Sequence, residues 1–212
     1  MSDETTELGI LAEDAFKNAS AAMYGQEHEA AQIVHEAVQQ SDQMFRAIHQ
    51  RALALVITRH PSPEQLRSIV RMQQIAGEFL RVVECAEAIA TQAVALGGLV
   101  DAFLLGVSEE APFLLLQVVR QAYVEMRGCV IATTTSDTAL ARRLIAEDEQ
   151  LDMIFAQLRD AIQAAIREHI ELSPQLHRVL LVGVHLAEIG DRVVAICRTL
   201  LFDYPADLHP VG

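Results

Sequence analysis

The sequence predicts an all-α protein built from two tandem three-helix bundles, six helices in all, and three observations support this. Hydrophobic residues make up 51% of the chain, yet aromatic residues are only 5% and Trp is absent, so small and aliphatic side chains must fill the core. Gly and Pro number only 10 and 6, too few for many hairpin turns. Apolar residues recur in steps of three and four, and this pattern occurs twice, as expected for repeated helices.

The first three helices are delimited by glycine and proline. A helix over residues 7–24 ends at a glycine, and a long helix over 27–59 follows it up to a His-Pro-Ser-Pro break. Ser62 and Gln65 have the spacing of a capping box, in which each side chain bonds the other residue's backbone N–H. We therefore expect the third helix to begin at this serine and to cover residues 63–96.

The second half repeats this order. Its expected elements are an apolar connection over 97–108, helices over 108–135, 137–170 and 173–202, and a terminal loop over 203–212. Ser108 and Asp137 are suitable N-cap residues for the fourth and fifth helices. Ser173-Pro174 repeats the Ser-Pro start of the third helix and is expected to open the sixth.

The apolar stripes of the two halves align. In the third helix the stripe is Ile69, Met72, Ala76, Phe79, Val83, Ala86 and Ala90, and a shift of 107 residues gives Leu176, Val179, Gly183, Leu186, Gly190, Val193 and Cys197. In the second helix Phe45, Ile48, Ala52 and Leu55 correspond, 106 residues later, to Leu151, Ile154, Leu158 and Ala161. Such a stripe is the buried side of a bundle helix. The chain is thus predicted to be a tandem duplication with domains 1–106 and 107–212.

The net charge of −13 restricts the classes of partner. The acidity is even, since residues 1–106 carry −7 and residues 107–212 carry −6. A surface this negative repels nucleic acid phosphates and anionic lipid, so neither is an expected partner. A protein with a basic face is expected instead. The helices are also too long for a compact helix-turn-helix, and no G-x-x-x-x-G-K-[ST] loop for nucleotide hydrolysis is present.

The cysteines and the apolar stretches point to a cytoplasmic protein. Cys85, Cys129 and Cys197 are odd in number and widely spaced, which is typical of reduced, buried thiols. The N-terminus, MSDETTELG, lacks the pattern of a signal peptide. The most apolar stretches, residues 93–107 and 113–131, are interrupted by charged residues, so we expect no insertion into a membrane.

Residues 38–67, VQQSDQMFRAIHQRALALVITRHPSPEQLR, resemble the PhoU family of phosphate-uptake regulators, and so do residues 186–196, LAEIGDRVVAI. Asp42 matches an aspartate of the family's long helix, and Pro61 matches the turn that follows it. The resemblance covers nearly the whole chain in the right order, twice. Because catalytic motifs are lacking, we expect no enzyme.

The resemblance implies a cytoplasmic adaptor between a phosphate ABC transporter, through its ATPase subunit, and a sensor histidine kinase. Such an adaptor damps the phosphate-starvation response when phosphate is plentiful. Homodimers are common in the family, so a homodimer is expected here.

The resemblance also implies candidate metal ligands. Some family members bind metal through Glu-x-x-x-Asp on the third helix of each bundle, a spacing that places both carboxylates on one helix face. Here the two copies are Leu80 with Glu84 and Ala187 with Asp191, so each has lost its first carboxylate. The remaining candidates for a divalent or ferric ion are Asp42, Glu84, Asp148, Asp152 and Asp191. The alternative is that these are solvated surface acids without a ligand.

A metal-binding carboxylate bundle, such as a ferritin-like oxidase or a metal store, is the alternative function. Ferritin-like sites use Glu-x-x-His pairs that point into the core, and this sequence contains none. His185 and Glu188, three residues apart, have a spacing that suits zinc, but no third ligand lies nearby in the sequence. We therefore expect His185 to be an ordinary surface or core histidine.

Overall fold

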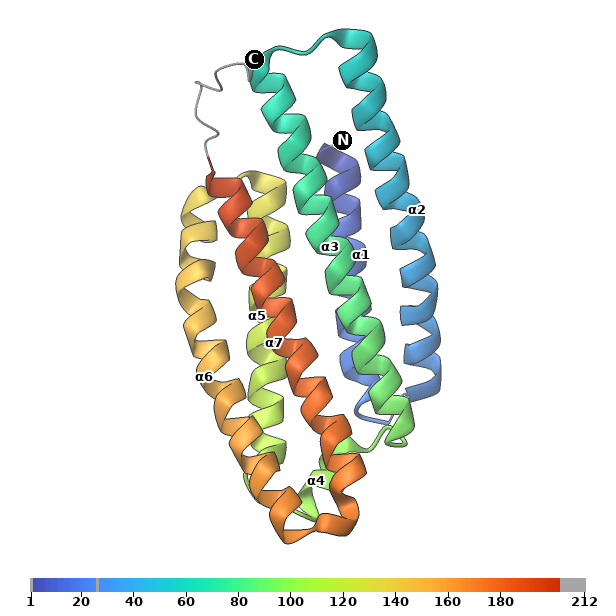
Figure 1. Cartoon of the computed structure of the whole chain (residues 1–212), viewed down its shortest axis with the longest axis vertical. Helices are drawn as coiled ribbons and strands as arrows, with labels where there is room; N and C mark the ends of the chain where they lie inside the picture. Colours follow the sequence, from blue (N-terminus) through green and yellow to red (C-terminus); the bar gives the residue numbers. More distant parts are fainter. Residues whose placement is uncertain (1, 26, 203–212) are drawn as a thin grey trace, which may run out of the picture.

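The computed structural model describes residues 2–25 and 27–202, and it is helical over most of that length (Figure 1). The helices are α1 Ser2–Ala22, α2 Glu27–Arg59, α3 Pro63–Ala95, α4 Val100–Leu105, α5 Ala111–Thr135, α6 Thr138–Glu168 and α7 Ser173–Leu201, with a 3₁₀ turn, η1, at Ile170–Leu172. The described residues contain no strand, only an isolated bridge between Tyr24 and Leu99. The all-α prediction is confirmed. The predicted loop over 203–212 lies outside the described residues.

Two three-helix bundles lie side by side (Figure 1). The first is made of α1, α2 and α3, and the second of α5, α6 and α7. The central helices α3 and α7 run antiparallel against each other, with α1 and α5 behind them and α2 and α6 on the two outer sides. The predicted tandem architecture is therefore confirmed. No described helix has a stretch both long and apolar enough to cross a membrane.

Two of the predicted helix caps are formed. The Gln65 N–H donates to Ser62 Oγ at 3.3 Å, and the Ser62 N–H donates to Gln65 Oε1 at 2.9 Å. Asp137 Oδ1 accepts from the N–H groups of Ala139 and Leu140 at 3.0 and 2.9 Å. These bonds satisfy amide groups that a helix start otherwise leaves without an intrahelical partner.

The predicted connection and the start of the fourth helix need correction. The stretch over 97–108 contains a short helix, α4, and α5 begins at Ala111 rather than at Ser108. Ser108 Oγ still accepts from the Ala111 N–H at 3.1 Å, so it supports the start from three residues earlier. The sixth helix begins at Ser173 as predicted, but the serine side chain does not cap it, because η1 leads directly into α7 and Leu172 occupies the N-cap position.

Most of the predicted stripe residues are buried; Phe45 of α2 and Ile154 and Ala161 of α6 are partly buried, and the largest departure is near the turn between α2 and α3. All seven stripe positions of α7 are buried, whereas Ile69 and Met72 of α3 and Leu55 of α2 are only partly so. Figure 1 shows the reason: this turn projects beyond the first residues of α1, so no third helix of the described part of the chain covers it. We call residues 46–71 at this end the α2–α3 tip.

A second buried stripe joins the bundles. It consists of Ile75, Val82 and Ile89 on α3 and of Val182, Ile189 and Ile196 on α7, all fully buried and all spaced seven residues apart. Arg192 Nη1 donates to Glu78 Oε2 at 3.4 Å, and Arg178 Nη1 donates to Gln92 Oε1 at 2.9 Å. These two contacts set an antiparallel register in which the level of Val82 lies within one residue of Ile189. We call these six residues the inter-bundle seam.

Candidate functional site

A glutamate lies inside the second bundle. Glu125 of α5 is completely buried, in the stripe that packs Ala122 and Cys129 into the core. Its Oε1 accepts from Gln121 Nε2 at 2.8 Å, while its Oε2 has no hydrogen-bond partner. Burial raises the pKa of Glu125 to about 7, and the charges of nearby carboxylates add to the rise while the Gln121 hydrogen bond opposes it.

The predicted aspartates of the second bundle gather near this glutamate. Burial raises the pKa of Asp148, and the negative charges of Asp152 and Asp191 raise it further. Gly190 leaves room for two of the acids: a Cβ built there would lie 2.9 Å from Asp148 Oδ1 and 3.5 Å from Glu125 Oε2. The structure therefore places Asp148 and Glu125 around one glycine, with Asp152 close enough to raise the pKa of both and Asp191 close enough to raise that of Asp148.

Among the described residues, the first bundle has no buried acid equivalent to Glu125. Asp42 has a side chain that is 50% exposed, and its Oδ2 accepts from Arg46 at 3.3 Å. Glu84 is exposed on α3. The buried positions of α1 recur on α5, so that Ala15 holds the place of Glu125. The two bundles thus share a fold but not a buried acid.

The second bundle suits a hard cation better than the first. Carboxylate oxygens are the ligands that Mg²⁺, Mn²⁺ and Ca²⁺ prefer, and Glu125 Oε2 is a buried oxygen that still needs a partner. Among the described residues, however, no three carboxylates bring ligand atoms within 4.8 Å of one another. The residues that do so are Cys85, His185 and Glu188. The metal site predicted at Asp42, Glu84, Asp148, Asp152 and Asp191 therefore stays a prediction.

Sequence reasoning missed Glu125. The acid lies within residues 113–131, where the charged residues argue against a membrane span but do not by themselves indicate a site. The available signal was its position, since Val118, Ala122, Glu125 and Cys129 follow the alternating four- and three-residue steps of a buried stripe. A charged residue within such a stripe is buried at a cost unless it has a partner.

The α2–α3 tip differs from the rest of the surface. Leu53, Val56, Ile57 and Leu66 are large hydrophobic residues exposed by 50, 37, 70 and 42%. A groove of about 490 Å³ lies beside them and is lined by Leu55, Arg59, Pro61, Gln65, Ser68 and Ile69. The tip carries five arginines and one acid, Glu64, in a chain whose net charge is −13.

Comparison with known proteins gives a consistent result. The model of the PhoU domain matches residues 5–93 and again 118–200. The chain is 22% identical over 198 residues to the phosphate-specific transport system accessory protein PhoU homolog of Rhizobium meliloti (strain 1021), covering 93% of this chain and 81% of that protein. It is 23% identical over 197 residues to the accessory protein PhoU of Edwardsiella tarda, covering 92% and 77%.

Two solved structures have the same fold. The crystal structure of PhoU from Pseudomonas aeruginosa superposes with a TM-score of 0.85 at 20% identity, covering 94% of this chain and 92% of that one. The phosphate transport system regulatory protein PhoU from Streptococcus pneumoniae gives a TM-score of 0.80 at 19% identity, covering 94% and 90%.

Proposed function

Because the chain belongs to the PhoU domain family, we propose that it regulates phosphate uptake by contact with other proteins. In this proposal it is a cytoplasmic adaptor, and a homodimer, that links the ATPase subunit of a phosphate ABC transporter to a sensor histidine kinase. It restrains the phosphate-starvation response and catalyses no reaction itself. The names of the relatives support this role, since they describe accessory proteins of phosphate-specific transport systems.

The α2–α3 tip is the observation that carries the proposal. Exposed groups of large apolar side chains are typical of protein interfaces, and this group lies on a projecting turn that no other described helix covers. Arginine is also enriched in interfaces. The tip therefore suits an acidic, partly apolar partner surface, whereas the acidic remainder of the molecule suits a basic one.

Binding of purified partners tests the adaptor role. We expect the chain to bind the immobilised ATPase subunit or the cytoplasmic part of the kinase, and Ile57→Asp to weaken that binding at least about tenfold, because a charge would replace a buried apolar contact. Ile170→Asp is the matched control, since Ile57 and Ile170 are 70 and 72% exposed and lie at opposite ends of the molecule. Failure of the unaltered chain to bind either partner at high and at low phosphate would refute the proposal.

A cellular experiment tests the direction of regulation. Deleting the gene should raise the expression of phosphate-starvation genes in phosphate-rich medium, and the unaltered chain and Ile170→Asp should both restore repression. Ile57→Asp should not restore it. Unchanged expression after deletion would contradict the proposed negative regulation.

Cation binding in the second bundle is a second candidate, favoured by the unpartnered Glu125 Oε2. We expect Mn²⁺ or Mg²⁺ to raise the melting temperature of the chain, because a ligand that binds only the folded state stabilises it. Glu125→Gln should abolish this shift, and the exposed Glu149→Gln should keep it. An equal rise in melting temperature in the unaltered chain, Glu125→Gln and Glu149→Gln would mean that the cation binds away from Glu125.

A further inference from the structure

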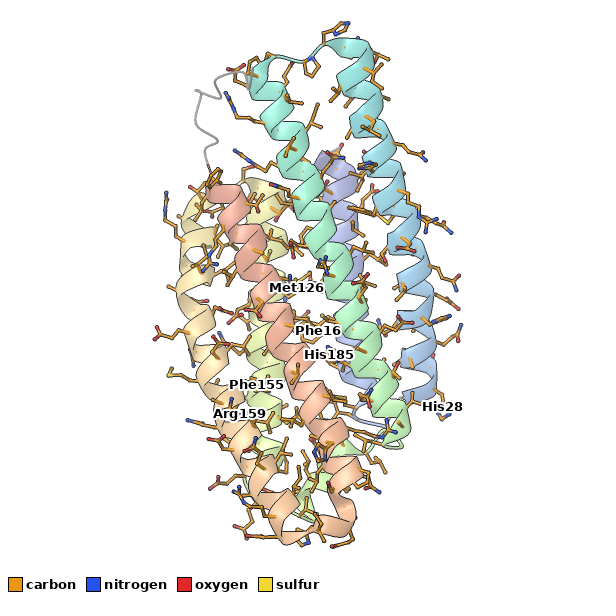
Figure 2. The ribbon with its side chains drawn as sticks, in the orientation of Figure 1. Phe16, His28, Met126, Phe155, Arg159 and His185 are labelled. Carbon is orange, nitrogen blue, oxygen red and sulfur yellow. The ribbon has the colours of Figure 1, made fainter. Side chains whose placement is uncertain are left out.

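Helices α3 and α7 bring three metal-ligating side chains together. His185 and Glu188 lie one turn apart on α7, with His185 Nδ1 and Glu188 Oε2 separated by 2.8 Å. Cys85 of α3 donates from Sγ to the same Oε2 at 3.6 Å. One ligand atom from each residue lies within 4.8 Å of the other two. Figure 2 labels His185 on the part of α7 that lies beside α3.

The cluster is accessible from solvent. Cys85 is buried, whereas the side chains of His185 and Glu188 are 26 and 42% exposed. A groove of about 240 Å³ opens over the three residues and is also lined by Arg81, Glu84 and Arg192. An ion therefore has a path from solvent to all three ligand atoms, with two further carboxylate oxygens close by on Glu84.

The internal repeat shows that this cluster replaces an ordinary ion pair. A shift of 107 residues relates Glu78 to His185 and Cys85 to Arg192. Since α3 and α7 run antiparallel, the contact between Glu78 and Arg192, at 3.4 Å, is the counterpart of the contact between His185 and Cys85. One position of the interface thus holds a carboxylate and a guanidinium, and the position related to it by the repeat holds a thiol, an imidazole and the Glu188 carboxylate.

We propose that Cys85, His185 and Glu188 form a binding site for a late divalent transition metal, Zn²⁺ above all, that links the two bundles. Sulfur, nitrogen and oxygen donors together match the preferences of Zn²⁺, whereas Mg²⁺ and Ca²⁺ require oxygen alone. Three protein ligands leave the fourth tetrahedral position to a water molecule. On binding, the thiol loses its proton to solvent and the sulfur bonds to the metal.

The geometry is close to what tetrahedral zinc requires. Zinc–ligand bonds of about 2.0–2.3 Å place neighbouring ligand atoms about 3.3–3.6 Å apart. The distance from Cys85 Sγ to Glu188 Oε2 is already 3.6 Å, and the distance of 2.8 Å from His185 Nδ1 to Glu188 Oε2 needs to open by a rotation of the carboxylate. Because the ligands come from α3 and α7, the ion would act as a cross-link at the inter-bundle seam.

Co²⁺ and Zn²⁺ titrations of the metal-free, reduced chain test this site. We expect one Co²⁺ per chain with a thiolate-to-cobalt charge-transfer band, displaced by Zn²⁺. Cys85→Ser and His185→Gln should each weaken Zn²⁺ binding at least about 100-fold, since loss of even a supporting residue costs up to about that much. His35→Gln is the matched control: His35 Nδ1 lies 3.1 Å from Glu87 Oε1, a similar pair that lacks a thiol.

Two results would overturn the proposal. One is the absence of a charge-transfer band in the unaltered chain, and the other is a Zn²⁺ affinity of Cys85→Ser and His185→Gln that equals the affinity of the unaltered chain. Circular dichroism verifies that each variant is folded. If Cys85→Ser unfolds, Glu188→Gln provides the same comparison, because its side chain is 42% exposed and its loss leaves the core intact. These titrations need no protein partner, so their outcome is independent of the adaptor role.

Discussion

At the scale of single residues, the second bundle contains a carboxylate where its first-bundle counterpart has a methyl group. Glu125 and Ala15 occupy equivalent buried positions, and burial raises the pKa of the glutamate to about 7 from its ordinary 4.5. The folded state consequently binds a proton more readily than the unfolded state does. Between pH 4.5 and about pH 7, the free energy of unfolding must therefore decrease as the pH rises.

Glu125→Gln tests this coupling, since the amide keeps the shape and removes the charge. We expect little difference from the unaltered chain at about pH 4.5 and a gain of up to roughly 3 kcal/mol in unfolding free energy at about pH 8, where Glu125 is ionised. Urea unfolding at both pH values measures the difference. Glu149→Gln, at an exposed position of α6, is the control and should show no such pH dependence. Equal gains for Glu125→Gln at the two pH values would contradict the explanation.

Gly190 is a residue whose lack of a side chain is required by its neighbours. In Gly190→Ala the new Cβ would lie 2.5 Å from Leu151 Cδ2 and 2.9 Å from Asp148 Oδ1, so we expect a loss of about 1–3 kcal/mol from overpacking. In Gly77→Ala the nearest atom is Phe45 Cε2 at 3.8 Å, and a gain of about 0.5–1 kcal/mol is expected from helix propensity. Thermal unfolding of both variants would show opposite signs.

At the scale of helices, identical sequence signals have different effects. Ser62-Pro63 and Ser173-Pro174 both lie at the start of a helix, yet only Ser62 accepts a hydrogen bond from the backbone of that start. Ser62 is extended, with ψ 162°, and follows His60 in the left-handed region, whereas a 3₁₀ turn runs directly into Ser173. The backbone conformation of the segment before the serine therefore decides whether the serine side chain can accept a hydrogen bond from the first turn of the helix.

Ser62→Ala should therefore cost about 1 kcal/mol of helix stability, while Ser173→Ala should cost clearly less. The effect belongs to the first turn of α3 at the α2–α3 tip, so hydrogen exchange of the amides at residues 64–66 measures it. Faster exchange in Ser62→Ala alone is the expected outcome. Equal effects of the two substitutions on their own helix starts would show that the capping box contributes nothing.

At the scale of the whole molecule, the inter-bundle seam makes two repeats into one body. Three buried residues from α3 and three from α7 lie between the bundles, at positions related by the internal duplication. Residues this deeply buried contribute to folding as much as the core of each bundle does. We therefore expect the bundles to unfold together rather than one after the other.

A double-mutant cycle on Val82→Ala and Ile189→Ala tests this coupling. Residues in contact depart from additivity by about 0.5–3 kcal/mol, whereas distant pairs add within about 0.5 kcal/mol. Pairing Val82→Ala with Leu158→Ala, in the core of the second bundle on α6, provides the distant control. Additive losses for Val82 and Ile189 would mean that the seam does not couple the bundles.

The sequence alone determined the local structure. Helix-spaced apolar residues, the Ser62 and Asp137 caps and the repeated stripe predicted all six long helices and their pairing into bundles. These signals act over three to seven residues, within the reach of a single helix. The same local character explains why α4 and the α5 start at Ala111 were not predicted, and why Ser173 opens α7 without capping it: neighbouring turns decided these outcomes.

The tertiary structure decided what lies between helices. It placed Glu125 near Asp148, and it brought Cys85 to His185 across about a hundred residues of chain. It also showed that the stripe from Ile75 to Ile89 faces the other bundle. No periodicity within one helix specifies the rotation and register of another against it, because these follow from how all the side chains pack together.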